Sequence, residues 1–147
     1  MTRRLTKSLF ILLLIVGCGK QNHKMISNEI HWGYNLDSAF TVASTSNQII
    51  MIDFMAEWCP PCKKMDENTF SNSMIIKKAN DFIPIRIDVD NNRTIAEGYN
   101  GNARKYGGIG IPNILFLDKE KKVIRHIVGF HDADQLMGIM DSVLIKL

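Results

Sequence analysis

Cysteine, histidine and clustered positive charge are all scarce in this sequence. The 147 residues include 3 cysteines and 4 histidines. A structural zinc ion takes about four ligands, and only one close pair of cysteines is present, so we expect no metal site. The lysines and arginines come in short groups separated by acids, which is typical of solvated surface rather than of a phosphate-binding patch. The sequence therefore argues against a metal-binding protein and against a nucleic-acid-binding protein.

Long apolar runs are also missing, and the run at residues 9–16 is too short to span a bilayer as a mature helix. Three basic residues precede it and Gly17-Cys18 follows it, which is the order of an export signal. Residues 15–18 resemble the lipobox of bacterial lipoproteins, in which the chain is cut before the cysteine and that cysteine receives a lipid. Cys18 is therefore the expected lipidation site. The alternatives are an ordinary signal peptide that is cut elsewhere and a retained anchor helix.

The expected organisation has three parts. Residues 1–17 are a lipoprotein signal peptide, residues 18–28 are a polar lipidated tether, and residues 29–147 are one domain. Removing the signal takes 3 of the 18 basic side chains and none of the 15 acidic ones, so the mature chain is close to neutral. We expect it in the bacterial cell envelope, lipid-anchored to a membrane, with the domain facing the periplasm or the cell exterior.

Hydrophobic periodicity and turn residues predict alternating helices and strands. The expected strands cover residues 49–56, 83–89, 113–117 and 123–128. The expected helices cover residues 36–46 behind an Asn35 cap, the cysteine motif to about residue 68, a stretch after the 71–73 cap, residues 103–106, and residues 132–146 behind an Asp132 cap. This order indicates an α/β fold, a mixed central sheet with helices on both faces.

The motif Trp58-Cys59-Pro60-Pro61-Cys62 follows the apolar strand 49–56 and is the most informative feature. Two cysteines separated by two residues, at a turn from strand to helix, make a dithiol that opens and closes reversibly. The helix N-terminus stabilises the Cys59 thiolate, and Pro60 favours an extended Cys59 as the cap requires. Because the two prolines withhold two N–H donors, we expect the pKa of Cys59 to be lowered less than in a loop without them. A purely structural disulfide is disfavoured, since so short a loop restrains the unfolded chain little.

The chain resembles the thioredoxin superfamily over roughly residues 30–146. The matching segments are residues 53–59, which lead into the cysteines, Gly110-Ile111-Pro112 and residues 128–130. Within the superfamily it is most similar to the C-terminal thioredoxin-like domain of the disulfide-interchange reductase DsbD, through Trp58-Cys59, Lys63 and residues 69–71.

The resemblance implies a role for each matching residue. Cys59 attacks the substrate disulfide, and Cys62, the less exposed cysteine, resolves the mixed disulfide. Asp53 is the buried acid beneath the pair, with a raised pKa that suits a group taking a proton from the resolving thiol. Arg86 stands where many thioredoxins have a lysine, and a guanidinium is expected to hold Asp53 ionised more firmly. Asp66 is expected to be an ordinary surface acid, although it is placed to influence the pair.

The substrate-binding residues implied by the resemblance are Trp58, Ile111 and Pro112. Pro112 is expected to follow a cis peptide bond and to present a backbone edge to substrate, with Ile111 against the disulfide. Trp58 is expected to be a partly exposed ring that shields the disulfide, simple core packing being the alternative. Asn113 departs from the threonine that is common after the cis-proline.

These observations favour a membrane-anchored, extracytoplasmic thiol–disulfide oxidoreductase that contributes to redox homeostasis by reducing disulfides in exported proteins. No cofactor is expected beyond the Cys59–Cys62 disulfide. The expected partners are exported protein thiols and disulfides and a membrane electron donor of DsbD type. The alternatives are an apocytochrome c thiol reductase, a non-catalytic binding module or holdase of thioredoxin fold, and an oxidant. The short interval from Cys62 to Pro112 disfavours the first, because it leaves little room for that branch's inserted element.

Overall fold

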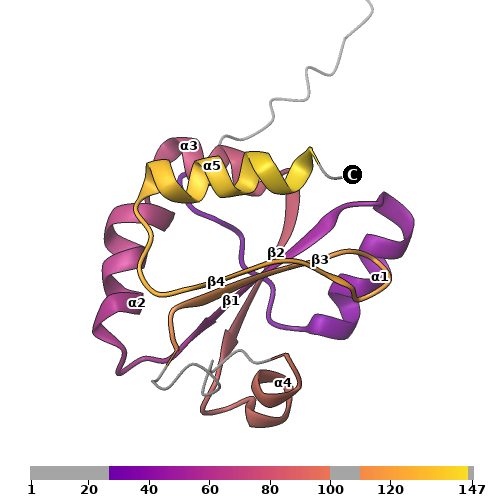
Figure 1. Ribbon diagram of the computed structural model, residues 1–147, viewed down its shortest axis with the longest axis horizontal. Coiled ribbons are helices and arrows are strands. Elements are labelled where there is room, and N and C mark those ends of the chain that lie inside the picture. The colour runs from indigo at the N-terminus through magenta and orange to yellow at the C-terminus, as the bar shows by residue number, and fades with distance from the viewer. Residues whose placement is uncertain (1–26, 100–109, 146–147) are drawn as a thin grey trace, which may run out of the picture.

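The computed structural model describes residues 27–99 and 110–145. Its centre is a four-stranded sheet in the order β2-β1-β3-β4. β1 runs parallel to β2 and antiparallel to β3, and β3 pairs antiparallel with β4. Figure 1 shows this twisted sheet, with α3 and α5 together on one side and α1 and α4 away from them. The expected α/β fold, a mixed sheet with helices on both faces, is confirmed.

The elements lie close to their expected positions. The strands are β1 (Ile49–Met55), β2 (Phe82–Asp88), β3 (Asn113–Leu117) and β4 (Val123–Val128). The helices are α1 (Leu36–Ser46), α2 (Pro60–Met65), the π-helical turn η1 (Asp66–Phe70), α3 (Ser73–Ala79), α4 (Arg93–Gly98) and α5 (Ala133–Leu144).

Short polar residues begin three of these helices. The side chain of Asn35 accepts the Ser38 N–H at the start of α1, and that of Asn72 accepts the Met74 N–H at the start of α3. Asp132 begins α5 with a reciprocal capping box. Each cap satisfies N–H groups that have no partner inside the helix, so these residues decide where the helices begin.

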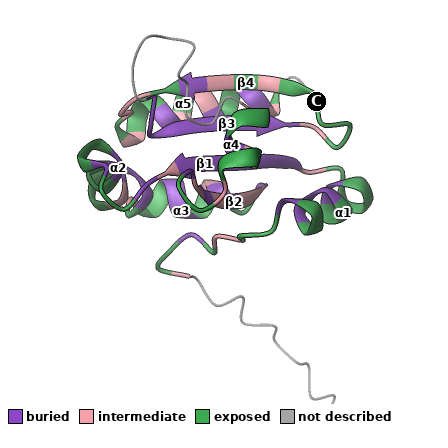
Figure 2. Cartoon of the chain, turned by 90° about the horizontal axis from the view of Figure 1, so that it is seen from below, coloured by how far each residue is buried: buried purple, intermediate pink, exposed green. Residues whose placement is uncertain are grey.

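β1 lies inside the sheet and separates two apolar cores. Successive side chains of a strand point to opposite faces. Ile50, Ile52 and Phe54 therefore join α1 and α4 in one buried cluster, whereas Ile49 and Met51 join α3 and α5 in the other. Figure 2 shows buried residues along β1 and β3 and exposed residues on the outer sides of the helices. Asp53 lies on the same face of β1 as Ile49 and Met51, so its carboxylate is directed into an apolar layer.

The structure corrects the predicted helices in two places. The helix that begins at the cysteines continues past the expected residue 68 through the π turn to Phe70. α4 forms at Arg93–Gly98, in a stretch for which no helix was expected. The expected helix at 103–106 lies outside the described residues, as do the signal peptide, Cys18 and most of the tether.

The segment before α1 covers the outer edge of β2. Gly33 forms an isolated parallel bridge with Ile85, and its N–H donates to the carbonyl oxygen of Pro84 at 2.9 Å. Pro84 fits an edge strand because it has no N–H to offer. In residues 27–99 and 110–145, every helix is too short or too polar to cross a membrane.

Candidate active site

The two cysteines lie where β1 ends and α2 begins, and they form a disulfide. Cys59 has the extended conformation of an N-cap residue, as expected before Pro60. The N–H of Cys62 donates to the sulfur of Cys59 at 3.2 Å. Pro60 and Pro61 fill the first two helical positions, so this one N–H is what the helix start offers the sulfur.

The loop before β3 closes over the sulfur of Cys59. The peptide bond between Ile111 and Pro112 is cis, as the resemblance implied, and the Cys59 sulfur lies 3.7 Å from the carbonyl oxygen of Ile111. The carbonyl oxygen of Pro112 accepts the N–H of Gly129 at 2.8 Å. Gly129 has a φ of 92°, a conformation that side chains disfavour, so a glycine is needed beside this loop.

The exposure of the cysteines differs from the prediction. Cys62 was expected to be the less exposed of the two, but Cys59 is 2% and Cys62 3% exposed. The contact of the Cys59 sulfur with the carbonyl oxygen of Ile111 contributes to this burial. Access to Cys59 in this disulfide form therefore requires movement of a neighbouring side chain or loop.

Trp58 stands at the edge of the site as a half-exposed ring. Its exposed fraction is 52%, which excludes simple core packing. Its Nε1–H donates to Oδ2 of Asp90 at 2.5 Å, and Asp90 comes from the turn after β2. This hydrogen bond fixes the indole beside the disulfide. Asp90 was not singled out from the sequence, because only the fold brings the β2 turn to Trp58.

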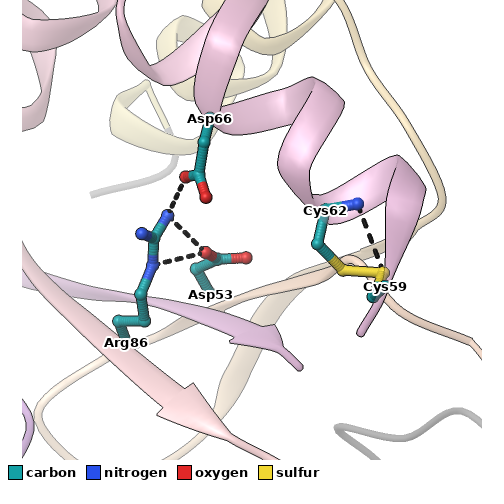
Figure 3. A network of polar contacts seen from close by, with 5 residues as sticks. All are labelled: Asp53, Cys59, Cys62, Asp66 and Arg86. Carbon is teal, nitrogen blue, oxygen red and sulfur yellow. Dashed lines mark hydrogen bonds and ion pairs between the residues drawn. A yellow bond between two sulfur atoms is a disulfide. The ribbon is translucent and has the colours of Figure 1, made fainter. Parts of the chain in front are cut away.

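Beneath the disulfide, Asp53 lies in a charged network with Arg86 and Asp66 (Figure 3). Asp53 and Arg86 are paired across β1 and β2, so both side chains point to the same face. Nε of Arg86 donates to Oδ2 of Asp53 at 2.9 Å. Burial raises the pKa of Asp53 to about 6, and the charge of Arg86 acts in the opposite direction without cancelling it. The expectation of a buried Asp53 with a raised pKa is therefore confirmed.

Asp66 corrects a second expectation. It is not an ordinary surface acid, because its Oδ1 lies 2.5 Å from Nη2 of Arg86 in an ion pair. Sequence reasoning placed Asp66 on the helical face of the cysteines but missed its link to Arg86. The register of β2 and the path of α2 into η1 create that link, and neither is visible in the sequence.

Together these contacts make a site suited to thiol–disulfide exchange. It has a disulfide at a helix start, a backbone loop beside one sulfur, and a buried carboxyl whose pKa is raised to about 6. Within the described parts of the chain, no group of three or more histidines, cysteines and acids is arranged to hold a metal ion.

Comparison with known proteins agrees with this geometry. A family model described as a thioredoxin-like domain matches residues 36–144. The thiol:disulfide interchange protein DsbD of Campylobacter jejuni (strain RM1221) is 36% identical over 95 residues, which are 63% of this chain and 16% of that relative. The match thus covers a small part of the longer protein.

Solved structures show the same fold. A DsbH oxidoreductase superposes with a TM-score of 0.64 at 18% identity, covering 85% of this chain and 91% of the other. The C-terminal domain of Neisseria meningitidis DsbD in its reduced form superposes with a TM-score of 0.58 at 22% identity, covering 73% and 92%. The chain therefore belongs to the thioredoxin-like domain family, and it carries the Cys59–Cys62 pair as a disulfide at the start of α2.

Proposed function

We propose that this protein is a membrane-anchored, extracytoplasmic reductase of disulfides in exported proteins. The observation that carries the proposal is the Cys59–Cys62 disulfide at the start of α2, held between the cis-Pro112 loop and the buried Asp53. The likeness to the thiol:disulfide interchange protein DsbD supports thiol–disulfide exchange at this pair. The reducing direction is the part of the proposal that a reduction potential tests.

The proposed reaction begins with the reduced dithiol. The Cys59 thiolate attacks one sulfur of the substrate disulfide, which forms a mixed disulfide and releases the first substrate thiolate. Cys62 then gives its proton to Asp53 and attacks the sulfur of Cys59, which releases the second substrate thiolate. Both released thiolates take up protons. The substrate disulfide is reduced by two electrons, and the Cys59–Cys62 dithiol is oxidised to the disulfide.

Substrate recognition is proposed to use the surface beside the sulfur of Cys59. The cis-Pro112 loop presents its backbone to an extended substrate segment once it moves away from Cys59, since Ile111 is only 5% exposed in the disulfide form. The half-exposed Trp58 provides apolar contact. The hydrogen bond from Trp58 to Asp90 holds the indole in place for this contact. No cofactor takes part in this proposal.

The proposed setting is the bacterial cell envelope. Residues 1–17 would direct export, Cys18 would carry the lipid, and residues 18–28 would hold the domain away from the membrane. A membrane electron donor of DsbD type would return the Cys59–Cys62 disulfide to the dithiol. The export signal, the lipid site and the tether rest on the sequence pattern of residues 1–28, and the electron donor rests on the likeness to DsbD.

Trapping the mixed disulfide tests the proposal in cells. A Cys62→Ser variant keeps the attacking thiol but lacks the resolving one, so exported proteins should accumulate in covalent complexes that reductant releases. The matched control is Cys59→Ser, which should trap none. An absence of complexes with Cys62→Ser would favour the non-catalytic binding module instead. So would a Cys59→Ser variant that keeps the protein's activity in cells. Complexes made up of apocytochrome c alone would favour the cytochrome maturation alternative.

A further inference from the structure

Arg86 is shared between two carboxylates (Figure 3). Its Nε and Nη2 each lie 2.9 Å from Oδ2 of Asp53, and the same Nη2 lies 2.5 Å from Oδ1 of Asp66. The side chain of Asp53 is 2% exposed, that of Arg86 17% and that of Asp66 39%. One cation thus serves a buried acid on β1 and a more accessible acid at the start of η1.

The guanidinium is also held by two aromatic rings. Its central carbon lies 4.5 Å from the centroid of Trp32 and 5.5 Å from that of Phe70. The two rings meet edge to face at 5.1 Å, and the backbone N–H of Arg86 donates to the carbonyl oxygen of Gly33 at 2.8 Å. These contacts on both the side chain and the backbone of Arg86 limit how far its guanidinium can move if one acid is removed.

The two oxygens of Asp53 have different surroundings. Oδ2 takes both contacts from Arg86, whereas the buried Oδ1 has no hydrogen-bond partner among the residues that the structure describes. Figure 3 shows Oδ1 pointing away from Arg86, on the side where the Cys59–Cys62 pair lies. Arg86 therefore holds the carboxyl in an orientation in which Oδ2 accepts from the guanidinium and Oδ1 can accept a proton.

We propose that Arg86 is a positioning residue, and that Asp66 acts through it to set how readily Asp53 accepts a proton. Asp66 forms an ion pair with the same Nη2 of Arg86. Arg86 therefore stabilises the charged form of Asp53 less strongly than it would if Asp53 were its only partner. This inference deepens the proposed function, since it concerns the acid proposed to take the proton from Cys62.

Among the described residues, the charges that act on Asp53 are those of Arg86 and Asp66. β2 contributes Arg86 and the start of η1 contributes Asp66, while β3 places the apolar Ile114 opposite Asp53. Cys59 and Cys62 do not titrate while they are bonded to each other. Burial raises the pKa of Asp53, Arg86 lowers it, and Asp66 raises it, which agrees in direction with the inference from the contacts.

A double-mutant cycle on the oxidised protein tests the inference. The side-chain carboxyl of Asp53 is followed by ¹³C NMR against pH in the unchanged protein, in Asp66→Asn, in Arg86→Gln and in the double variant. Asp66→Asn should lower the midpoint of the Asp53 titration by about one pH unit, because Arg86 then forms an ion pair with Asp53 alone. In the Arg86→Gln background the same change should lower it by less than half as much.

Two results would overturn the inference. If Asp66→Asn lowers the midpoint equally with and without Arg86, Asp66 acts directly by its charge and not through the guanidinium. If Asp66→Asn raises the midpoint, Asp66 holds Arg86 in place rather than drawing it away. Glu67→Gln is the matched control, because Glu67 neighbours Asp66 without belonging to the network, and it should leave the midpoint unchanged. If Arg86→Gln does not fold, Arg86→Lys replaces it, since an ammonium lacks the planar fork that reaches both acids.

The NMR readout does not depend on catalysis, so it separates this inference from the proposed function. The pH profile of disulfide reduction is measured on the same variants. A rising limb that moves with the NMR midpoint supports both the shared Arg86 and the proposed role of Asp53. Midpoints that move while the rate profile stays fixed would support the shared Arg86 and overturn the role of Asp53 as proton acceptor.

Discussion

At the scale of single residues, Asp53 makes stability depend on pH. Its pKa is raised from 3.8 to about 6 by burial, so the folded protein binds this proton more tightly than the unfolded chain does. The resulting stabilisation is complete below about pH 4 and is lost as the pH rises through 6, and it amounts to about 3 kcal/mol. Above pH 6 the ionised carboxylate remains buried, and its Oδ1 has no hydrogen-bond partner in the described part of the chain.

Replacing Asp53 with asparagine should remove this dependence. We expect the oxidised Asp53→Asn protein to be more stable than the unchanged protein at pH 7.5, by up to about 3 kcal/mol, with the difference vanishing near pH 4. Arg86 keeps its ion pair with Asp66 in the variant, which limits the stability lost when its contact with the Asp53 carboxylate is removed. Urea unfolding at both pH values measures the difference. An equal difference at pH 4 and pH 7.5 would contradict the buried, pH-dependent role of Asp53.

A second prediction at this scale concerns the prolines between the cysteines. Pro61→Gly restores one N–H in the first turn of α2, beside the sulfur of Cys59. We expect the pKa of the Cys59 thiol in the reduced protein to fall by roughly half a unit, because the added N–H stabilises the thiolate. The rate of alkylation against pH reports this value. A pKa that is unchanged or higher would show that the prolines do not limit thiolate stabilisation.

At the scale of elements, α5 tests how much a helix cap contributes. The side chain of Asp132 accepts the N–H of Gln135, and the side chain of Gln135 accepts the N–H of Asp132. Asp132→Ala should reduce the free energy of unfolding by about 1 kcal/mol. The control is Asp134→Ala, which removes an acid from the same first turn without breaking the cap. Equal losses in urea unfolding would mean that charge, not capping, is what Asp132 provides.

The segment before α1 allows another prediction at this scale. Trp32 packs on Phe70 and over Arg86, so it connects this segment to the network beneath the disulfide. We expect Trp32→Ala to cost about 2 kcal/mol of stability through lost ring contacts. Water would then reach Arg86 and Asp53, so the pKa of Asp53 should move down towards its ordinary value. Loss of stability with an unchanged Asp53 midpoint in the NMR titration would show that Trp32 packs without shielding the network.

Elements whose signals are local could be predicted from the sequence. Asn35 and Asp132 mark where α1 and α5 begin, and the charged turn between β3 and β4 marks the hairpin. The π turn could not be predicted, because its side chains follow a helical pattern and nothing local distinguishes it from an α-helix. α4 buries only Ala96, so its amphipathic signal is weak.

The candidate site was partly predictable for the same reason. Cys59, Cys62 and Pro112 stand in recognisable short motifs, and the position of Asp53 follows from its place in the strand that leads to the cysteines. The bridge from Arg86 to Asp66 and the bond from Trp58 to Asp90 join segments that are distant in sequence. Such contacts depend on strand register and helix path, which a single sequence does not reveal.

At the scale of the whole molecule, the proposed anchor is open to a direct test. If Cys18 carries a lipid, Cys18→Ala should move the protein from the membrane fraction to the soluble fraction of fractionated cells, because the acyl chains hold it at the membrane. Cys62→Ser is the matched control and should stay with the membrane. A Cys18→Ala protein that remains membrane-bound would instead favour a retained anchor helix.

The reduction potential of the purified protein tests the central claim most directly. The protein is equilibrated in glutathione buffers of known potential, and free thiols of Cys59 and Cys62 are trapped and counted. A reductase of exported proteins should give a value near the thioredoxin end of the scale, about −270 mV. A value near −120 mV would make the protein an oxidant and contradict the proposed direction of electron flow.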